Sequence, residues 1–161
     1  MTLLVLVGGL LLAATPAAAD EPSDGWAFYG GIYDTVNDDN PLELGVEYRF
    51  RTFELFTLDI EPAVGVAGTE DENAWVYLSF RWDWPLGERW TVTPQTGISL
   101  YEQGDGKDLG GVVEFRSGLE IAYRLPGGSQ LGLLFYHLSN ADIYDENPGS
   151  NSLVLIWSLG R

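Results

Sequence analysis

Eight strand-like stretches of the chain are separated by turn-rich breaks, and several of them alternate between apolar and polar side chains with the two-residue period of a β-strand. They cover residues 25–34, 42–52, 55–67, 74–84, 89–101, 111–124, 130–139 and 152–160. In one of them the apolar face consists of Val76, Leu78, Phe80, Trp82 and Trp84. The other face of that stretch consists of Tyr77, Ser79, Arg81 and Asp83. The pattern predicts an all-β fold, an eight-stranded antiparallel barrel.

Alternation alone does not say which face meets water. A soluble barrel buries its apolar face, whereas a transmembrane barrel turns that face to lipid and pairs its charges inside. Most of the stretches are about as long as the roughly 9–11 residues that a tilted strand needs to cross a bilayer. Aromatic residues make up 13% of the chain, which suits the aromatic girdles of such barrels. These features favour a transmembrane barrel, and a soluble exported barrel that binds an apolar ligand is the alternative.

The breaks between the stretches alternate in length. Those at 35–41, 68–73, 102–110 and 140–151 are long and acidic, and those at 52–54, 85–88 and 125–129 are short. Outer-membrane barrels have short periplasmic turns and longer external loops. If both termini are periplasmic, the four long breaks are all external. The stretch 130–139 then runs outward and ends at the external surface.

The first residues resemble a secretory signal. Leu3 to Ala14 form a short apolar stretch, and Ala17-Ala18-Ala19 gives a small-residue cleavage pattern, although a basic segment before the leucines is missing. We expect a signal peptide at residues 1–19 and a barrel domain at 20–161. An exported barrel of this kind is expected in the outer membrane.

Charge excludes one class of partner. The formal net charge is −16, so a surface that neutralises nucleic-acid phosphates is not expected. The chain has no cysteine, which is compatible with a barrel that closes on itself without disulfides.

The chain's single histidine supplies the candidate chemistry. His137 and Ser139 are two residues apart in the stretch 130–139, so they share one face of the strand. That face otherwise carries Leu131, Leu133 and Phe135. A neutral imidazole can take the proton of a serine hydroxyl and make the serine a nucleophile. Such a pair on an apolar face indicates chemistry on a lipid.

The residues around this pair form a longer motif. Phe135-Tyr136-His137-Leu138-Ser139-Asn140-Ala141 is followed by Asn147-Pro148-Gly149 and by Ser152-Leu153. This motif closely resembles the signature of the PagL-type lipid A 3-O-deacylases, which are often grouped with the acyloxyacyl hydrolases. The resemblance implies an eight-stranded outer-membrane barrel that hydrolyses the ester-linked acyl chain at position 3 of lipid A.

The resemblance also implies roles for individual residues. Ser139 would be the nucleophile and His137 the general base, while Asn140 would help to stabilise the oxyanion. The partners would be lipopolysaccharide and the lipids of the outer membrane, with no metal ion or cofactor needed. The sequence leaves a homodimer open.

Two positions depart from the family pattern. Fourteen residues beyond the histidine the family carries a glutamate that orients the imidazole, and this chain has Asn151. The family's Ser-Asn-Ala-Gly reads Ser-Asn-Ala-Asp here, with Asp142 where a glycine amide would line the oxyanion site. An asparagine can still orient a histidine but cannot stabilise the imidazolium by charge. A fully active esterase, a slow one and an inactive homologue of structural role therefore all stay open.

Overall fold

The computed structural model describes residues 24–36 and 40–160, and the expected signal peptide lies outside them. These residues form ten strands, and all of the pairings between them are antiparallel. The strands are β1 (Gly25–Ile32), β2 (Leu42–Arg49), β3 (Phe53–Leu55), β4 (Leu58–Thr69), β5 (Ala74–Arg81), β6 (Trp84–Leu86), β7 (Trp90–Glu102), β8 (Val113–Arg124), β9 (Gln130–Ser139) and β10 (Ser150–Ser158).

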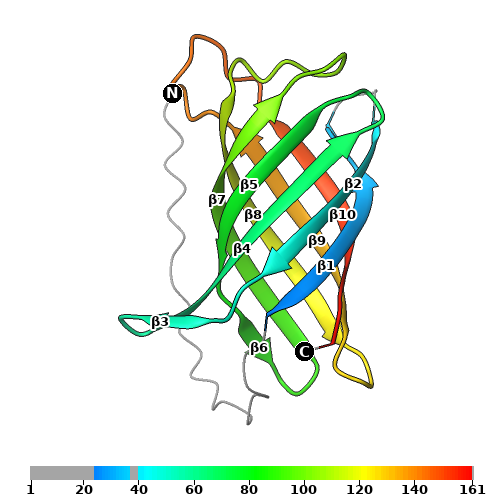
Figure 1. The fold of residues 1–161 in the computed structure, drawn as a ribbon, viewed down its shortest axis with the longest axis vertical. Coiled ribbons are helices and arrows are strands. Elements are labelled where there is room, and N and C mark those ends of the chain that lie inside the picture. Colours follow the sequence, from blue (N-terminus) through cyan, green and yellow to red (C-terminus); the bar gives the residue numbers. More distant parts are fainter. Residues whose placement is uncertain (1–23, 37–39, 161) are drawn as a thin grey trace.

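Eight of these strands close into a barrel (Figure 1). Their order is β2-β1-β10-β9-β8-β7-β5-β4, and the pairing of β2 with β4 closes the ring. The long connections lie at one end of the barrel, and β3, β6 and the C-terminal end of β10 lie at the other (Figure 1). The expected fold is thus confirmed, and the breaks expected on one side of the membrane lie at one end of the barrel. Their lengths differ from the expectation, because the connection from β4 to β5 is short and those from β2 to β4 and from β5 to β7 are longer, with β3 and β6 inside them.

Two expected strands differ from the structure. The stretch 55–67 is not one strand, because the chain turns at Phe56 and Thr57, and β3 pairs back onto β4. Phe56 has a φ of +58°, although the segment has no glycine, proline or asparagine to signal a turn. The stretch 74–84 ends at Arg81, and β6 extends the next hairpin by pairing with β7.

The outer surface of the barrel is apolar and its interior is charged. Large apolar side chains are exposed on every barrel strand, including Phe28, Leu44, Val66, Val76, Leu100, Phe115, Leu133 and Leu155. The buried charged side chains include Glu43, Glu47, Arg49, Arg81, Glu114, Arg116 and Glu120. Water would not favour this distribution, but lipid does. The fold is a transmembrane β-barrel, and the soluble alternative is wrong.

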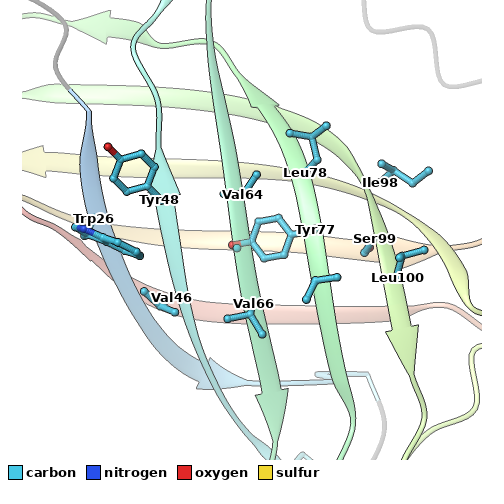
Figure 2. A pocket seen from close by; sticks show the side chains of 12 residues that line it. Trp26, Val46, Tyr48, Val64, Val66, Tyr77, Leu78, Ile98, Ser99 and Leu100 are labelled. Carbon is cyan, nitrogen blue, oxygen red and sulfur yellow. The ribbon is translucent and has the colours of Figure 1, made fainter.

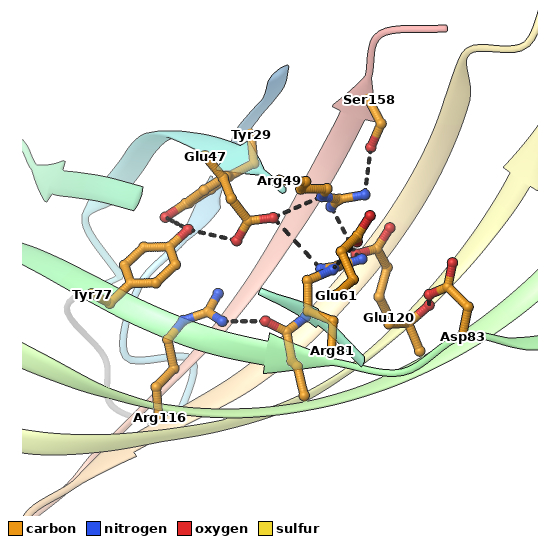
Figure 3. A network of polar contacts seen from close by, with 12 residues as sticks. Tyr29, Glu47, Arg49, Glu61, Tyr77, Arg81, Asp83, Arg116, Glu120 and Ser158 are labelled. Carbon is orange, nitrogen blue, oxygen red and sulfur yellow. Dashed lines mark hydrogen bonds and ion pairs between the residues drawn. The ribbon is translucent and has the colours of Figure 1, made fainter. Parts of the chain in front are cut away.

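Ion pairs join the charged interior into a network (Figure 3). Arg81 lies 3.0 Å from both Glu61 and Glu120 and also contacts Glu47. Arg49 lies 2.8 Å from Glu47 and 3.2 Å from Glu120. Such pairing compensates charges that would be costly to bury alone. The interior therefore acts as a polar core inside the apolar wall.

Within the described ranges, no helix is long and apolar enough to cross a membrane.

Candidate functional site

The candidate catalytic residues lie at the end of the barrel that carries the long connections (Figure 1). His137 and Ser139 are the outward-facing residues at the end of β9, and Asn151 is the outward-facing residue near the start of β10. All three are partly exposed, and below them the surface consists of exposed side chains such as Phe135 and Leu153. The alternation of β9 therefore places the site on the lipid-facing wall, as the sequence predicts.

A hydrogen bond joins His137 to Asn151. The two residues lie directly opposite each other on β9 and β10, and Nδ1 of His137 lies 3.0 Å from Oδ1 of Asn151. An amide oxygen only accepts hydrogen bonds, so Nδ1 carries the imidazole hydrogen. Nε2 then keeps its lone pair, which is the state that a general base needs. Asn151 thus orients the imidazole without supplying a charge.

Ser139 lies on the same face of β9 as His137, two residues further along the strand. Its neighbour across the ladder is Phe115 of β8. Among the described residues, the Ser139 hydroxyl makes no side-chain hydrogen bond, including none to His137. In free enzymes the contact between nucleophile and base is often long and shortens when the substrate binds.

Ser117 is a further outward-facing hydroxyl beside His137. It lies directly across from His137 on β8, on the side away from Asn151, and is exposed. The sequence analysis missed Ser117, because only the pairing of β8 with β9 brings it next to the histidine.

Asn140 is buried behind the site. Its side-chain amide donates to the carbonyl oxygens of Leu109, at 2.9 Å, and Glu146, at 2.8 Å. Its side-chain oxygen Oδ1 accepts from the backbone N–H of Asp142. Both amide hydrogens are therefore used inside the protein, and none is left for the expected oxyanion. In this arrangement Asn140 stabilises the turn after Ser139.

Asp142 lies in the turn that follows. Ala141 and Asp142 have φ values of +54° and +62°, in the left-handed region that favours glycine. Aspartate tolerates this region better than most residues. Its carboxylate also accepts from the side-chain amide of Asn147, at 2.9 Å. Asp142 thus adopts, in this turn, a backbone conformation that glycine adopts most easily.

Gly149 lies against the imidazole. A Cβ at this position would be 2.8 Å from Cε1 of His137, and its φ is +61°. Both the close approach and the backbone conformation therefore require glycine. This explains why the Asn147-Pro148-Gly149 part of the motif accompanies the histidine.

The β7–β8 connection packs against the β9–β10 connection. Tyr144 covers Gly111, where a Cβ would be 1.9 Å from the ring, and its hydroxyl accepts from the N–H of Val113 at 3.2 Å. The carbonyl of Glu146 lies against Gly110. Gly110 and Gly111 are the signal for this contact in the sequence. Only the fold shows that they contact Glu146 and Tyr144.

An apolar depression of about 710 Å³ lies over β1, β2, β4, β5 and β7 (Figure 2). Its outward-facing lining includes Trp26, Val46, Val64, Val66, Leu78 and Ile98. Because β4 is the strand opposite β9 in the ring, this depression lies on the far side of the barrel from His137. It belongs to the lipid-facing wall.

Metal ligands are not gathered in the described part of the chain. No group of three or more His, Cys, Asp or Glu side chains there could hold a metal ion.

A family model described as lipid A 3-O-deacylase (PagL) matches residues 42–159. The chain belongs to this family. The lipid A deacylase PagL of Bordetella bronchiseptica is 24% identical over 165 aligned positions, which cover 92% of this chain and 90% of that protein. The resemblance seen in the motif is thus confirmed over most of the barrel.

Two solved structures share the fold. The crystal structure of the outer membrane enzyme PagL matches with a TM-score of 0.66 at 15% identity, over 86% of this chain and 100% of that chain. A de novo designed transmembrane β-barrel matches with a TM-score of 0.57 at 9% identity, over 87% of this chain and 98% of the other. Membership of the PagL family, the barrel fold and the apolar wall confirm the expected location in the outer membrane.

Proposed function

We propose that this PagL-family chain is a serine esterase that removes the acyl chain ester-linked at position 3 of lipid A. Ser139 is the nucleophile, His137 is the general base and Asn151 orients His137. The observation that carries the proposal is the hydrogen bond of His137 to Asn151 on the lipid-facing wall, two residues from Ser139. An ester in the outer leaflet can reach this surface without leaving the membrane.

The reaction proceeds in two halves. In the first, the Ser139 oxygen bonds to the ester carbonyl carbon while Nε2 of His137 takes the hydroxyl proton. The bond from that carbon to the sugar oxygen breaks, and His137 gives the proton to this oxygen. In the second, water adds to the acyl carbon and gives a proton to His137, which returns it to Ser139 as the fatty acid leaves.

Asn140 and Asp142 support the site by shaping the turn after Ser139. The proposal assigns them this positioning role because their hydrogen bonds lie within the turn and against Leu109. Their effect on the reaction is therefore indirect, through the placement of the nucleophile.

Refolded protein incubated with lipid A tests the proposal. The wild type should release fatty acid, and Ser139→Ala and His137→Ala should reduce release to the background of a vesicle without protein. Ser129→Ala is a matched control, because Ser129 lies in the turn at the other end of β9. Equal release from the wild type and Ser139→Ala would refute Ser139 as the nucleophile.

A non-catalytic barrel is the second candidate, and Asn151 is the residue that favours it. A wild type that releases no fatty acid, in a barrel shown to be folded by heat-modifiable migration on gels, would favour this candidate.

A further inference from the structure

A chain of contacts connects His137 to the only lysine of the protein. The side chain of Asn151 orients His137. The backbone carbonyl oxygen of Asn151 accepts a hydrogen bond from the backbone N–H of Thr35, at 2.9 Å. Thr35 follows β1, and its neighbour Asp34 forms an ion pair with Lys107 of the β7–β8 connection. Lys107 is therefore linked to the imidazole through Asp34, Thr35 and Asn151.

The ion pair is well formed. Nζ of Lys107 lies 2.9 Å from each of the two carboxylate oxygens of Asp34. The Asp34 side chain is 8% exposed and the Lys107 side chain is 24% exposed. Charge-assisted hydrogen bonds of this length are stronger than neutral ones, and partial burial limits their screening by solvent.

Asp34 also has an unusual backbone conformation. Its φ is +52°, in the left-handed region, which costs free energy for a residue with a Cβ. Such a conformation persists when surrounding contacts maintain it. The two bonds from Lys107 are such contacts, and the conformation they maintain directs the next N–H, that of Thr35, to Asn151.

The same connection also braces the nucleophile side of the site. The carbonyl of Leu109, two residues after Lys107, accepts from the Asn140 amide next to Ser139. The backbone carbonyl of Lys107 accepts from the hydroxyl of Tyr101, at 2.7 Å, which anchors Lys107 at the barrel mouth. The β7–β8 connection therefore contacts both sides of the site, although it carries no candidate catalytic group.

We propose that Lys107 is a positioning residue, whose ion pair with Asp34 holds Asn151 in place and thereby keeps His137 in the tautomer that can act as a base. This inference rests on the proposed function for its kinetic consequence, but its structural consequence is independent of activity.

Nitrogen-15 NMR of the imidazole tests the inference directly, because His137 is the only histidine and gives a single pair of ring signals. Refolded wild type in detergent should show the hydrogen on Nδ1. Lys107→Met should shift the ring toward a mixture of the two tautomers, and Lys107→Arg should retain the wild-type pattern. A wild-type pattern in Lys107→Met would overturn the proposal.

Kinetics provide the second measurement. With lipid A as substrate, Lys107→Met should lower kcat about tenfold and leave KM within about twofold, because the interaction acts on the base and not on substrate binding. Exchanging the charges, with Asp34→Lys and Lys107→Asp together, should recover part of the loss. Unchanged kcat in Lys107→Met, in an active wild type, would also overturn the proposal.

Arg51→Met is the matched control for the removal of one positive charge. Arg51 is 78% exposed and lies 3.9 Å from Asp24, just after the end of β2 that lies away from the site. It should change neither the imidazole signals nor kcat. If the wild type is inactive, the esterase proposal fails, and the NMR result still decides whether Lys107 positions His137.

Discussion

At the scale of single residues, Asn151 determines how His137 can work. Its side-chain oxygen Oδ1 fixes the hydrogen on Nδ1, and the neutral amide adds no charge that would stabilise an imidazolium in the proposed acyl transfer. The structure therefore contains the hydrogen bond between His137 and Asn151, and in the proposed reaction its electrostatic contribution is weaker than a carboxylate would provide.

Replacement of Asn151 by glutamate should therefore raise activity. A related aspartate-to-asparagine change in a serine protease lowers turnover by about 10⁴-fold, so we expect Asn151→Glu to raise kcat by at least about tenfold. Fatty acid release from lipid A measures this. Gln103→Glu makes the same amide-to-acid change at an exposed position of the same barrel end and should have no effect. An equal response of the two variants would contradict the account.

At the scale of elements, the β9–β10 connection shapes the site through backbone conformation. Ala141, Asp142 and Gly149 all have positive φ values, and Gly149 lies directly against the imidazole. The connection is thus a defined turn, braced by Asn140 from below and by Tyr144 against the β7–β8 connection.

Gly149→Ala should impair catalysis without unfolding the barrel. The new Cβ would lie 2.8 Å from Cε1 of His137 and must displace the ring or the turn. A misplacement of about 1 Å can lower the rate about 10²-fold, so we expect a loss of kcat of that size. Gly87→Ala is the control, because Gly87 has a φ of +73° with no atom within 4 Å of the added Cβ. Similar activities of the two variants would show that contact with His137 does not matter.

Sequence periodicity predicts the barrel strands well, because lipid outside and charge inside impose opposite polarity on alternate residues. It fails at the β3–β4 turn, where Phe56 adopts a positive φ that no local residue type signals. Periodicity places His137 and Ser139 on one face, and the family resemblance adds Asn151, but neither gives information on Lys107 or Ser117. Ser117 lies beside His137 through ladder pairing, and Lys107 is linked to Asn151 through Asp34 and Thr35, so both depend on contacts between segments far apart in the chain.

At the scale of the whole molecule, the barrel depends on its charged interior. Arg81 contacts three carboxylates, those of Glu47, Glu61 and Glu120, and is 1% exposed (Figure 3). Loss of this side chain would remove one of the two guanidinium groups that compensate the buried Glu47 and Glu120, together with the ion pair to Glu61.

Arg81→Leu should therefore destabilise the barrel by about 3–5 kcal/mol, the usual cost of removing one partner of a buried ion pair. Urea unfolding followed by tryptophan fluorescence, together with heat-modifiable migration, measures the change. Arg51→Leu removes an exposed charge and should leave the unfolding midpoint unchanged. A stable Arg81→Leu barrel would show that the network contributes little to the fold.

We propose that Ser139 on the lipid-facing wall cleaves an ester of lipid A. Mass spectrometry of lipid A from outer membranes that contain the wild type or Ser139→Ala at equal amounts tests it most directly. Lipid A lacking one 3-linked acyl chain should accumulate only with the wild type. Identical lipid A from the two membranes would contradict it.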